Sequence, residues 1–182
     1  MKKYFLFLSL GVFLAQNVKA VEIEPYVGAD YVYSFADVKH DDYVENRYHA
    51  LNASLGAMIT STIGAELSYQ ISKQNKKNSD ICQTKSEYKI FGLDGVYYFS
   101  ILDKIQLLGS AGLGYYEFKV KVKSGIAFDH DDENHFGLRA GLGAQYNIDN
   151  NWAARLMLKY HYIDSKAIDS ITDVTLGVRY YF

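Results

Sequence analysis

Charged side chains recur at alternate positions of segments that are otherwise apolar, and they are the residues best placed to do chemistry. Carboxylates and cations occur in equal number in this set: Asp30, Glu66, Asp94, Asp173, Arg139, Arg155, Lys159 and Arg179. Equal numbers favour mutual pairing in a low-dielectric interior, since an unpaired buried ion costs several kcal/mol. The same residues could instead line a proton path or a narrow channel for ions or small solutes. Both interpretations stay open at the level of the sequence.

Other candidate chemistry is sparse. Cys82 is the one cysteine, which excludes an intrachain disulfide framework and a cysteine-based zinc site. Two acidic runs, His40-Asp41-Asp42 and Asp129-His130-Asp131-Asp132-Glu133, could hold a divalent cation, and His135 lies beside the second. Neither run has the spacing of an EF-hand, and acidic surface loops are usually only solvated. We therefore assign no metal and no cofactor, and a formal net charge of −2 gives no reason to expect nucleic acid.

The first twenty residues have the pattern of a secretory signal peptide and are set apart from the fold. Lys2 and Lys3 precede an apolar run that ends before the small-residue site Val18-Lys19-Ala20. The run has about a dozen residues, whereas a helix that spans a bilayer needs ~20. We expect cleavage after Ala20, so that residues 1–20 are a signal peptide and residues 21–182 form one domain.

That domain reads as segments in which apolar and polar residues alternate with a period of two. The segments are residues 27–35, 51–59, 63–72, 91–99, 107–115, 136–146, 152–162 and 173–182. Such alternation is typical of β-strands with two different faces, and about ten residues is the length of a tilted strand that crosses a bilayer. Ile90 and Val96 break the rule, because they share the polar side of the fourth segment.

Three features favour a membrane barrel over a soluble sandwich. The polar faces hold glycine, serine and charges, which would make a poor core for a sandwich. The connections alternate between short turns and longer links, the latter at residues 36–47, 73–85, 119–134 and 163–170. Aromatic residues collect at the ends of the apolar faces, as two interfacial girdles require: Tyr33, Phe35, Tyr69, Tyr97, Phe99, Tyr115, Tyr146, Trp152, Tyr160, Tyr162, Tyr180 and Phe182. The sequence therefore predicts an all-β fold, an eight-stranded antiparallel up-and-down transmembrane β-barrel with both termini in the periplasm.

The sequence resembles the family of small outer-membrane barrels that includes the OmpA-type transmembrane domain, the OmpX type and the opacity proteins. The last strand ends on alternating apolar and aromatic residues, Val178, Tyr180 and Phe182, which resembles the signal that the outer-membrane assembly machinery recognises. The other residues that carry the resemblance are Tyr26-Val27-Gly28-Ala29, Gly112-Leu113-Gly114-Tyr115, Gly137-Leu138-Arg139-Ala140-Gly141-Leu142-Gly143-Ala144 and Leu158-Lys159-Tyr160-His161-Tyr162. The resemblance implies the outer membrane of a Gram-negative bacterium, and loops that contact host or environmental ligands.

A lipid A-modifying enzyme is the catalytic alternative. The deacylase type needs a histidine and a serine two positions apart, so that the imidazole can activate the hydroxyl. His161 and Ser165 are four positions apart, which on a strand is about 13 Å. The palmitoyltransferase type needs a hollow barrel, whereas an eight-stranded barrel carrying these charges is filled by its own side chains. We expect no enzymatic activity.

Charged residues beyond the strands suggest contacts outside the membrane. Lys119, Lys121 and Lys123 continue the outward-facing side of the fifth segment, at the height where lipopolysaccharide phosphates would lie. The link 73–85 is basic and the link 119–134 is partly acidic. The sequence therefore predicts a non-enzymatic surface protein with lipid, lipopolysaccharide and loop ligands as partners, and a narrow channel is the alternative.

Overall fold

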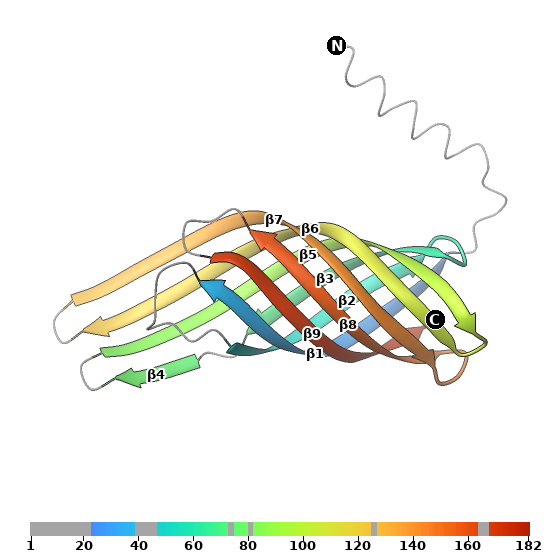
Figure 1. The fold of residues 1–182 in the computed structure, drawn as a ribbon, viewed down its shortest axis with the longest axis horizontal. Helices are drawn as coiled ribbons and strands as arrows, with labels where there is room; N and C mark the ends of the chain where they lie inside the picture. The colour runs from blue at the N-terminus through green and yellow to red at the C-terminus, as the bar shows by residue number, and fades with distance from the viewer. Residues whose placement is uncertain (1–22, 39–46, 73–74, 80–81, 125–126, 164–167) are drawn as a thin grey trace, which may run out of the picture.

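The strands form one continuous antiparallel sheet that closes into a barrel (Figure 1). The computed structural model describes residues 23–38, 47–72, 75–79, 82–124, 127–163 and 168–182. Its strands are β1 (Glu24–Val38), β2 (Arg47–Met58), β3 (Ile63–Ser72), β4 (Asn75–Ser79), β5 (Cys82–Leu102), β6 (Ile105–Ser124), β7 (Ala127–Asn147), β8 (Trp152–Ile163) and β9 (Ile168–Tyr181). No helix able to cross a membrane occurs among these residues.

Pairing between β3 and β5 closes the barrel. The spatial order is β3-β2-β1-β9-β8-β7-β6-β5, and β3 pairs with β5 from Ile63↔Tyr97 to Ile71↔Lys89. Closure gives the backbone of every barrel strand a partner on both sides, which a bilayer requires because it offers no water to unpaired groups. The short strand β4 is not one of the eight, because among the described residues it pairs only with β5, beyond the barrel. The prediction of an eight-stranded up-and-down barrel is confirmed.

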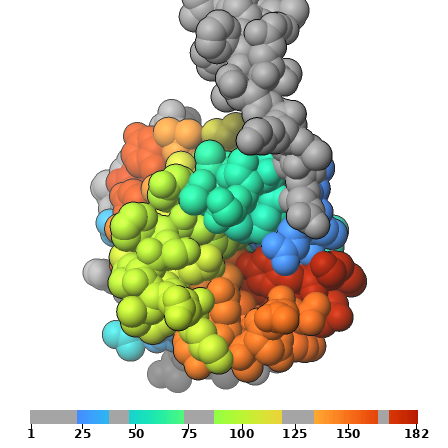
Figure 2. Space-filling view, turned by 90° about the vertical axis from the view of Figure 1, so that its right-hand side faces the viewer, coloured from blue at the N-terminus to red at the C-terminus, as the bar shows by residue number. Residues whose placement is uncertain are grey.

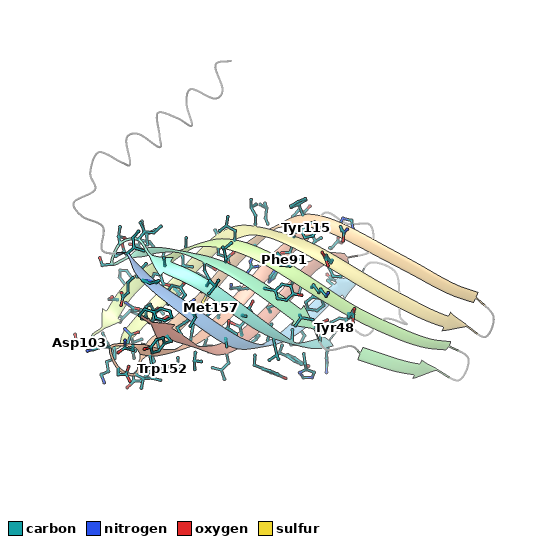
Figure 3. All side chains as sticks on the ribbon, turned by 180° about the vertical axis from the view of Figure 1, so that it is seen from behind. Tyr48, Phe91, Asp103, Tyr115, Trp152 and Met157 are labelled. Atoms are coloured by element: carbon teal, nitrogen blue, oxygen red, sulfur yellow. The ribbon has the colours of Figure 1, made fainter. Side chains whose placement is uncertain are left out.

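The two faces of the sheet carry different side chains, as the predicted alternation requires. The outward face carries large exposed apolar side chains such as Leu51, Leu55 and Leu142, which are 64%, 63% and 72% exposed. Aromatic pairs lie at both ends of this face: Tyr69 with Phe91 and Tyr115 with Phe136 at one end, Trp152 with Tyr180 at the other. Figure 3 labels Phe91, Tyr115 and Trp152. A soluble protein could not leave so much apolar surface in water. The outward face is therefore the lipid-facing one.

The barrel has two unlike ends. One end carries the short turns between β2 and β3, β5 and β6, and β7 and β8, together with the start of β1 and the end of β9; these turns lie around the end seen in Figure 2. From the other end β5, β6 and β7 project well beyond the barrel (Figure 1). We call these the short-turn end and the hairpin end.

The longer links expected at residues 73–85 and 119–134 contain strand structure of their own. The first contains β4 and the beginning of β5, and the second is a β-hairpin, since β6 runs to Ser124 and β7 begins at Ala127. The continuation of the fifth segment through Lys119, Lys121 and Lys123 is present as β6. The sequence did not indicate β4 or the first seven residues of β7, because neither stretch alternates between apolar and polar residues. The links at 39–46 and 164–167 and the expected signal peptide lie outside the described residues.

Candidate functional site

The lumen is layered, with the charged residues between one apolar cluster at the hairpin end and two toward the short-turn end. At the hairpin end the cluster consists of Val32, Tyr48, Ala50, Tyr88, Ile90, Tyr116, Ile163 and Ile171. Toward the short-turn end lie Val96, Tyr98, Leu108 and Met157, followed by Tyr26, Ala153 and Tyr181. Figure 3 shows Tyr48 near the first end and Met157 nearer to the second. These clusters separate the charges from water at both mouths.

Glu66 lies at the centre of the charged layer. Its carboxylate accepts a hydrogen bond of 2.7 Å from Arg155 Nη1 and one of 3.0 Å from the Tyr26 hydroxyl. Lys159 Nζ and Arg179 Nε are 3.9 and 3.4 Å from its oxygens. In the ring of eight strands, β3 and β8 are four places apart, so the contact between Glu66 and Arg155 crosses the full width of the lumen.

Two further carboxylates extend this layer. Asp94 accepts from Arg139 Nη2 at 2.9 Å and from Lys159 Nζ at 3.0 Å. Asp30 accepts twice from the Arg179 guanidinium, at 2.7 and 3.1 Å, and the Asn52 amide donates to it as well. Lys159 lies near both Glu66 and Asp94, and Arg179 near both Glu66 and Asp30. We call the seven residues Asp30, Glu66, Asp94, Arg139, Arg155, Lys159 and Arg179 the central ion network.

Asp173 is buried in the lumen but belongs to a separate group nearer the hairpin end. Its Oδ2 is 3.2 Å from His161 Nε2 and accepts a hydrogen bond of 2.9 Å from the Gln70 amide. The other ring nitrogen of His161 shares a hydrogen bond of 2.8 Å with the Tyr116 hydroxyl. His161 is fully buried, and Ser165 lies outside the described residues. The imidazole is therefore bound between a phenol and a carboxylate beneath the apolar cluster.

Sequence reasoning missed the neutral groups that complete the network. Gln145 Oε1 accepts hydrogen bonds from Arg155 Nε and Nη2, at 3.2 and 3.0 Å. The Tyr98 hydroxyl accepts from Arg155 Nη2 at 3.0 Å, and the guanidinium lies 5.5 Å from the centre of the Tyr26 ring. All of these residues occupy the inward positions of the alternating pattern, which is the signal that could have found them. A buried ion pair needs such additional hydrogen bonds to offset its loss of hydration.

Inward-facing glycines make room for the large lumen side chains. A Cβ added at Gly92 would lie 1.7 Å from Arg139 Nη1, and one at Gly56 would lie 2.2 Å from the Tyr26 ring. No carbon can approach so closely, so the guanidinium and the phenol occupy the space that another side chain would fill. The glycines on the polar faces are thus part of the packing of the network.

The space left between the charges is very small. The void lined by Glu66, Arg155 and their neighbours has a volume of about 10 Å³, roughly the room of one water molecule. A hollow of about 530 Å³ opens at the short-turn end, lined by residues that include Asp103, Trp152 and Tyr181. The charged layer is therefore filled by its own side chains, as expected for eight strands. No cluster able to hold a metal ion occurs among the described residues.

The remaining predicted site residues lie elsewhere. Val178 and Phe182 are exposed on the outward face at the short-turn end, and Tyr180 packs edge-to-face against Phe182. The backbone of Lys119, Lys121 and Lys123 continues β6 past the barrel, opposite Asp132, His130 and Phe128 of β7. The positions of these three lysine side chains are outside what the structure describes.

Comparison with known proteins identifies the family. The model of the outer membrane protein beta-barrel domain matches residues 5–182, so the chain belongs to this family of outer-membrane barrels. A comparison with curated proteins finds no significant match.

Solved structures share the fold at low sequence identity. Neisserial surface protein A (NspA) is 17% identical, with a TM-score of 0.66, and the match covers 88% of this chain and 97% of that one. Ail, the attachment invasion locus protein of Yersinia pestis, is 19% identical, with a TM-score of 0.61 and coverage of 90% and 100%. The N-terminal barrel of Pseudomonas aeruginosa OprF is 19% identical, with a TM-score of 0.59 and coverage of 86% and 97%.

The central ion network leads to a first prediction. Glu66→Gln removes the carboxylate that faces Arg155, so a buried guanidinium loses its counter-charge, and the free energy of unfolding should fall by about 3–5 kcal/mol. Urea titration of the protein folded in phospholipid vesicles measures this change. Glu24→Gln, the same substitution at an exposed position of the barrel rim, should change it by less than ~0.5 kcal/mol. Equal effects of the two substitutions would show that the network does not stabilise the barrel.

The glycines give a second, independent prediction. Gly92→Ala places a methyl group against the Arg139 guanidinium and should lower the free energy of unfolding by about 1–3 kcal/mol. Gly95→Ala is the matched control on the same strand, because its Cβ would point outward, 3.8 Å from its nearest neighbour, the Ala111 carbonyl oxygen. The same urea titration compares them, and a Gly92→Ala protein as stable as the Gly95→Ala protein would contradict the packing described here.

Proposed function

We propose that this protein is a non-enzymatic, surface-exposed barrel of the outer membrane, which acts through the sheet that projects from its hairpin end. The observation that carries the proposal is the contrast between the filled lumen of the barrel and the strands that project from it. The lumen is filled by the central ion network and closed by apolar clusters, whereas β4, β5, β6 and β7 continue the sheet beyond the barrel. The sequences of the projecting strands are rich in charged residues.

The orientation follows from the rule for such barrels. Bacterial outer-membrane barrels have short turns on the periplasmic side and long connections outside. This rule places the short-turn end, with the start of β1 and the end of β9, in the periplasm, and it places the projection outside the cell. Signal-peptide cleavage after Ala20 and recognition of Val178, Tyr180 and Phe182 by the assembly machinery are parts of the same proposal.

The projection has the chemistry of a contact surface for a host or environmental ligand. Lys76 and Lys77 lie on β4 and Lys85 on β5, while β7 carries Asp129, Asp131 and other acidic residues. Lys119, Lys121 and Lys123 lie on β6 beyond the barrel, and we propose that they contact lipopolysaccharide phosphates. For comparison, Ail has been crystallised in complex with the heparin analogue sucrose octasulfate. A protein or polyanion ligand would fit these charges.

Shortening the projection tests the proposal. Residues 119–132 would be replaced by Asn-Gly, a two-residue turn between Phe118 and Glu133, which pair in the register of β6 and β7. Attachment of expressing cells to surfaces coated with heparin or with extracellular proteins should fall several-fold, while the amount of protein in the outer membrane stays unchanged. The control is Lys104→Glu, a charge reversal in the exposed turn at the opposite end of the barrel. Attachment unchanged by the shortened projection would contradict the proposal.

A narrow ion channel is the second candidate, because the charged side chains of the lumen contact one another in sequence. The contacts run from Asp30 through Arg179, Glu66, Lys159 and Asp94 to Arg139. The filled lumen argues against it, and we expect purified protein in planar bilayers to show no steady conductance. Conductance that disappears on neutralising Arg155 or Lys159 would establish the channel instead. A change in the mass of lipid A on expression would establish an enzyme.

A further inference from the structure

We propose that copies of this protein associate side by side in the membrane, the β4 edge of one projection pairing with the β7 edge of the next. The contact would continue the projecting sheet from one molecule to its neighbour. This inference concerns self-association and does not depend on the ligand of the proposed function.

Both edges of the projection have backbone groups available for pairing. Among the described residues, β4 pairs with β5 alone, and residues 127–133 of β7 pair with β6 alone, because the ladder between β7 and β8 begins only at Gly137↔Ile163. Figure 1 shows β4 and β7 at opposite edges of the projection. The unpaired N–H and C=O groups of a strand edge are a template for a further strand.

The two edges carry opposite charge. The sequence of β4 is NKKNS, which contributes Lys76 and Lys77 and no acidic residue. Residues 127–133 of β7 have the sequence AFDHDDE, with four acidic residues and no lysine or arginine. Opposite charges on facing strands are stabilising and like charges are destabilising. Charge therefore favours pairing of β4 with β7 over pairing of either edge with its own kind.

Strand direction and position agree with this pairing. Adjacent strands from β4 to β7 are antiparallel, so β4 runs opposite to β7. Copies inserted in one membrane share one orientation, so β4 of one copy meets β7 of the next in the antiparallel sense. The register places the edges level along the sheet, because Lys77 pairs with Thr84, Thr84 with Val122, and Val122 with Asp129. Neither edge has to shift along the strands to face the other.

The contact uses two different surfaces, which has a consequence for assembly. An interface in which one patch meets an identical patch stops at a dimer, whereas a head-to-tail interface continues into rings or open rows. Each copy that pairs through β4 still presents its own β7 edge. We therefore expect assemblies larger than dimers in the plane of the membrane.

Disulfide cross-linking in native outer-membrane vesicles tests the inference. In a Cys82→Ser background, Lys77→Cys is combined in the same chain with Asp129→Cys, Asp131→Cys or Glu133→Cys. After mild oxidation, at least one combination should give a ladder of dimers, trimers and larger species on a non-reducing gel, and each single-cysteine chain should give no ladder. No ladder from any combination, or dimers from Lys77→Cys alone, would overturn the proposal.

Charge reversal tests the specificity of the contact. In the double-cysteine chain that forms the ladder, Lys76→Glu should lower the cross-linked fraction several-fold. Adding Asp132→Lys to this variant should restore the fraction. Lys104→Glu, at the far end of the barrel, should have no effect. An equal effect of Lys76→Glu and Lys104→Glu would contradict pairing of these edges.

The unmodified protein provides a second readout. A carbodiimide joins lysine amines to carboxylates, so vesicles holding a mixture of isotopically light and heavy chains should yield mixed-mass peptides that link β4 to β7. Links from β4 or β7 to a different protein, with no mixed-mass pair, would show that another partner occupies these edges and would overturn self-pairing.

Discussion

The contact between Glu66 and Arg155 is the interaction on which the rest of the interior depends. It joins β3 to β8 across the width of the barrel at 2.7 Å, so the two side chains together span the lumen that eight strands enclose. Because both groups are withdrawn from water, each needs further partners, which Tyr26, Lys159, Gln145 and Tyr98 supply. Losing one charge would leave the other uncompensated, so the arrangement behaves as a unit.

Several features of the sequence follow from this interaction. Glycines such as Gly56 and Gly92 occur where Tyr26 and Arg139 lie against the wall. Apolar residues occupy inward positions at both mouths, where they keep the ion pairs in a medium of low dielectric constant. With the lumen filled in this way, the described parts of the molecule that can meet another molecule are the lipid-facing surface, the short-turn end and the projecting sheet.

The sequence predicted those properties that depend on parity alone. Alternation assigned the outward face, the inward charges and the number of barrel strands. Successive side chains of a strand point to opposite faces, and where the strand crosses the bilayer one of these faces meets lipid and must be apolar. Alternation did not predict which charges meet, since Glu66 and Arg155 are brought together by the closure of the sheet and by its register. Asp173 shows this limit, because its partner is His161 and not one of the four cations.

Beyond the membrane the sequence indicated less of the structure. Valines and lysines alternate in β6 from Lys119 to Lys123, and this alternation indicated that the strand continues. No rule forces one face to be apolar outside the bilayer, so β4 and the charged start of β7 gave little signal. The inward apolar clusters were missed for the opposite reason: residues such as Tyr88 and Ile171 lie on the face expected to be polar. Ile90 and Val96 were the visible exceptions, and both are buried in these clusters.

A closed outer-membrane barrel stabilised by its interior can be tested by the mobility of the protein on a detergent gel. Outer-membrane fractions would be run with and without boiling. A closed barrel resists unfolding by detergent at room temperature, so we expect two distinct mobilities and a shift to the unfolded position on boiling. A single mobility in both samples, with the protein found in the soluble periplasmic fraction, would contradict the closed barrel.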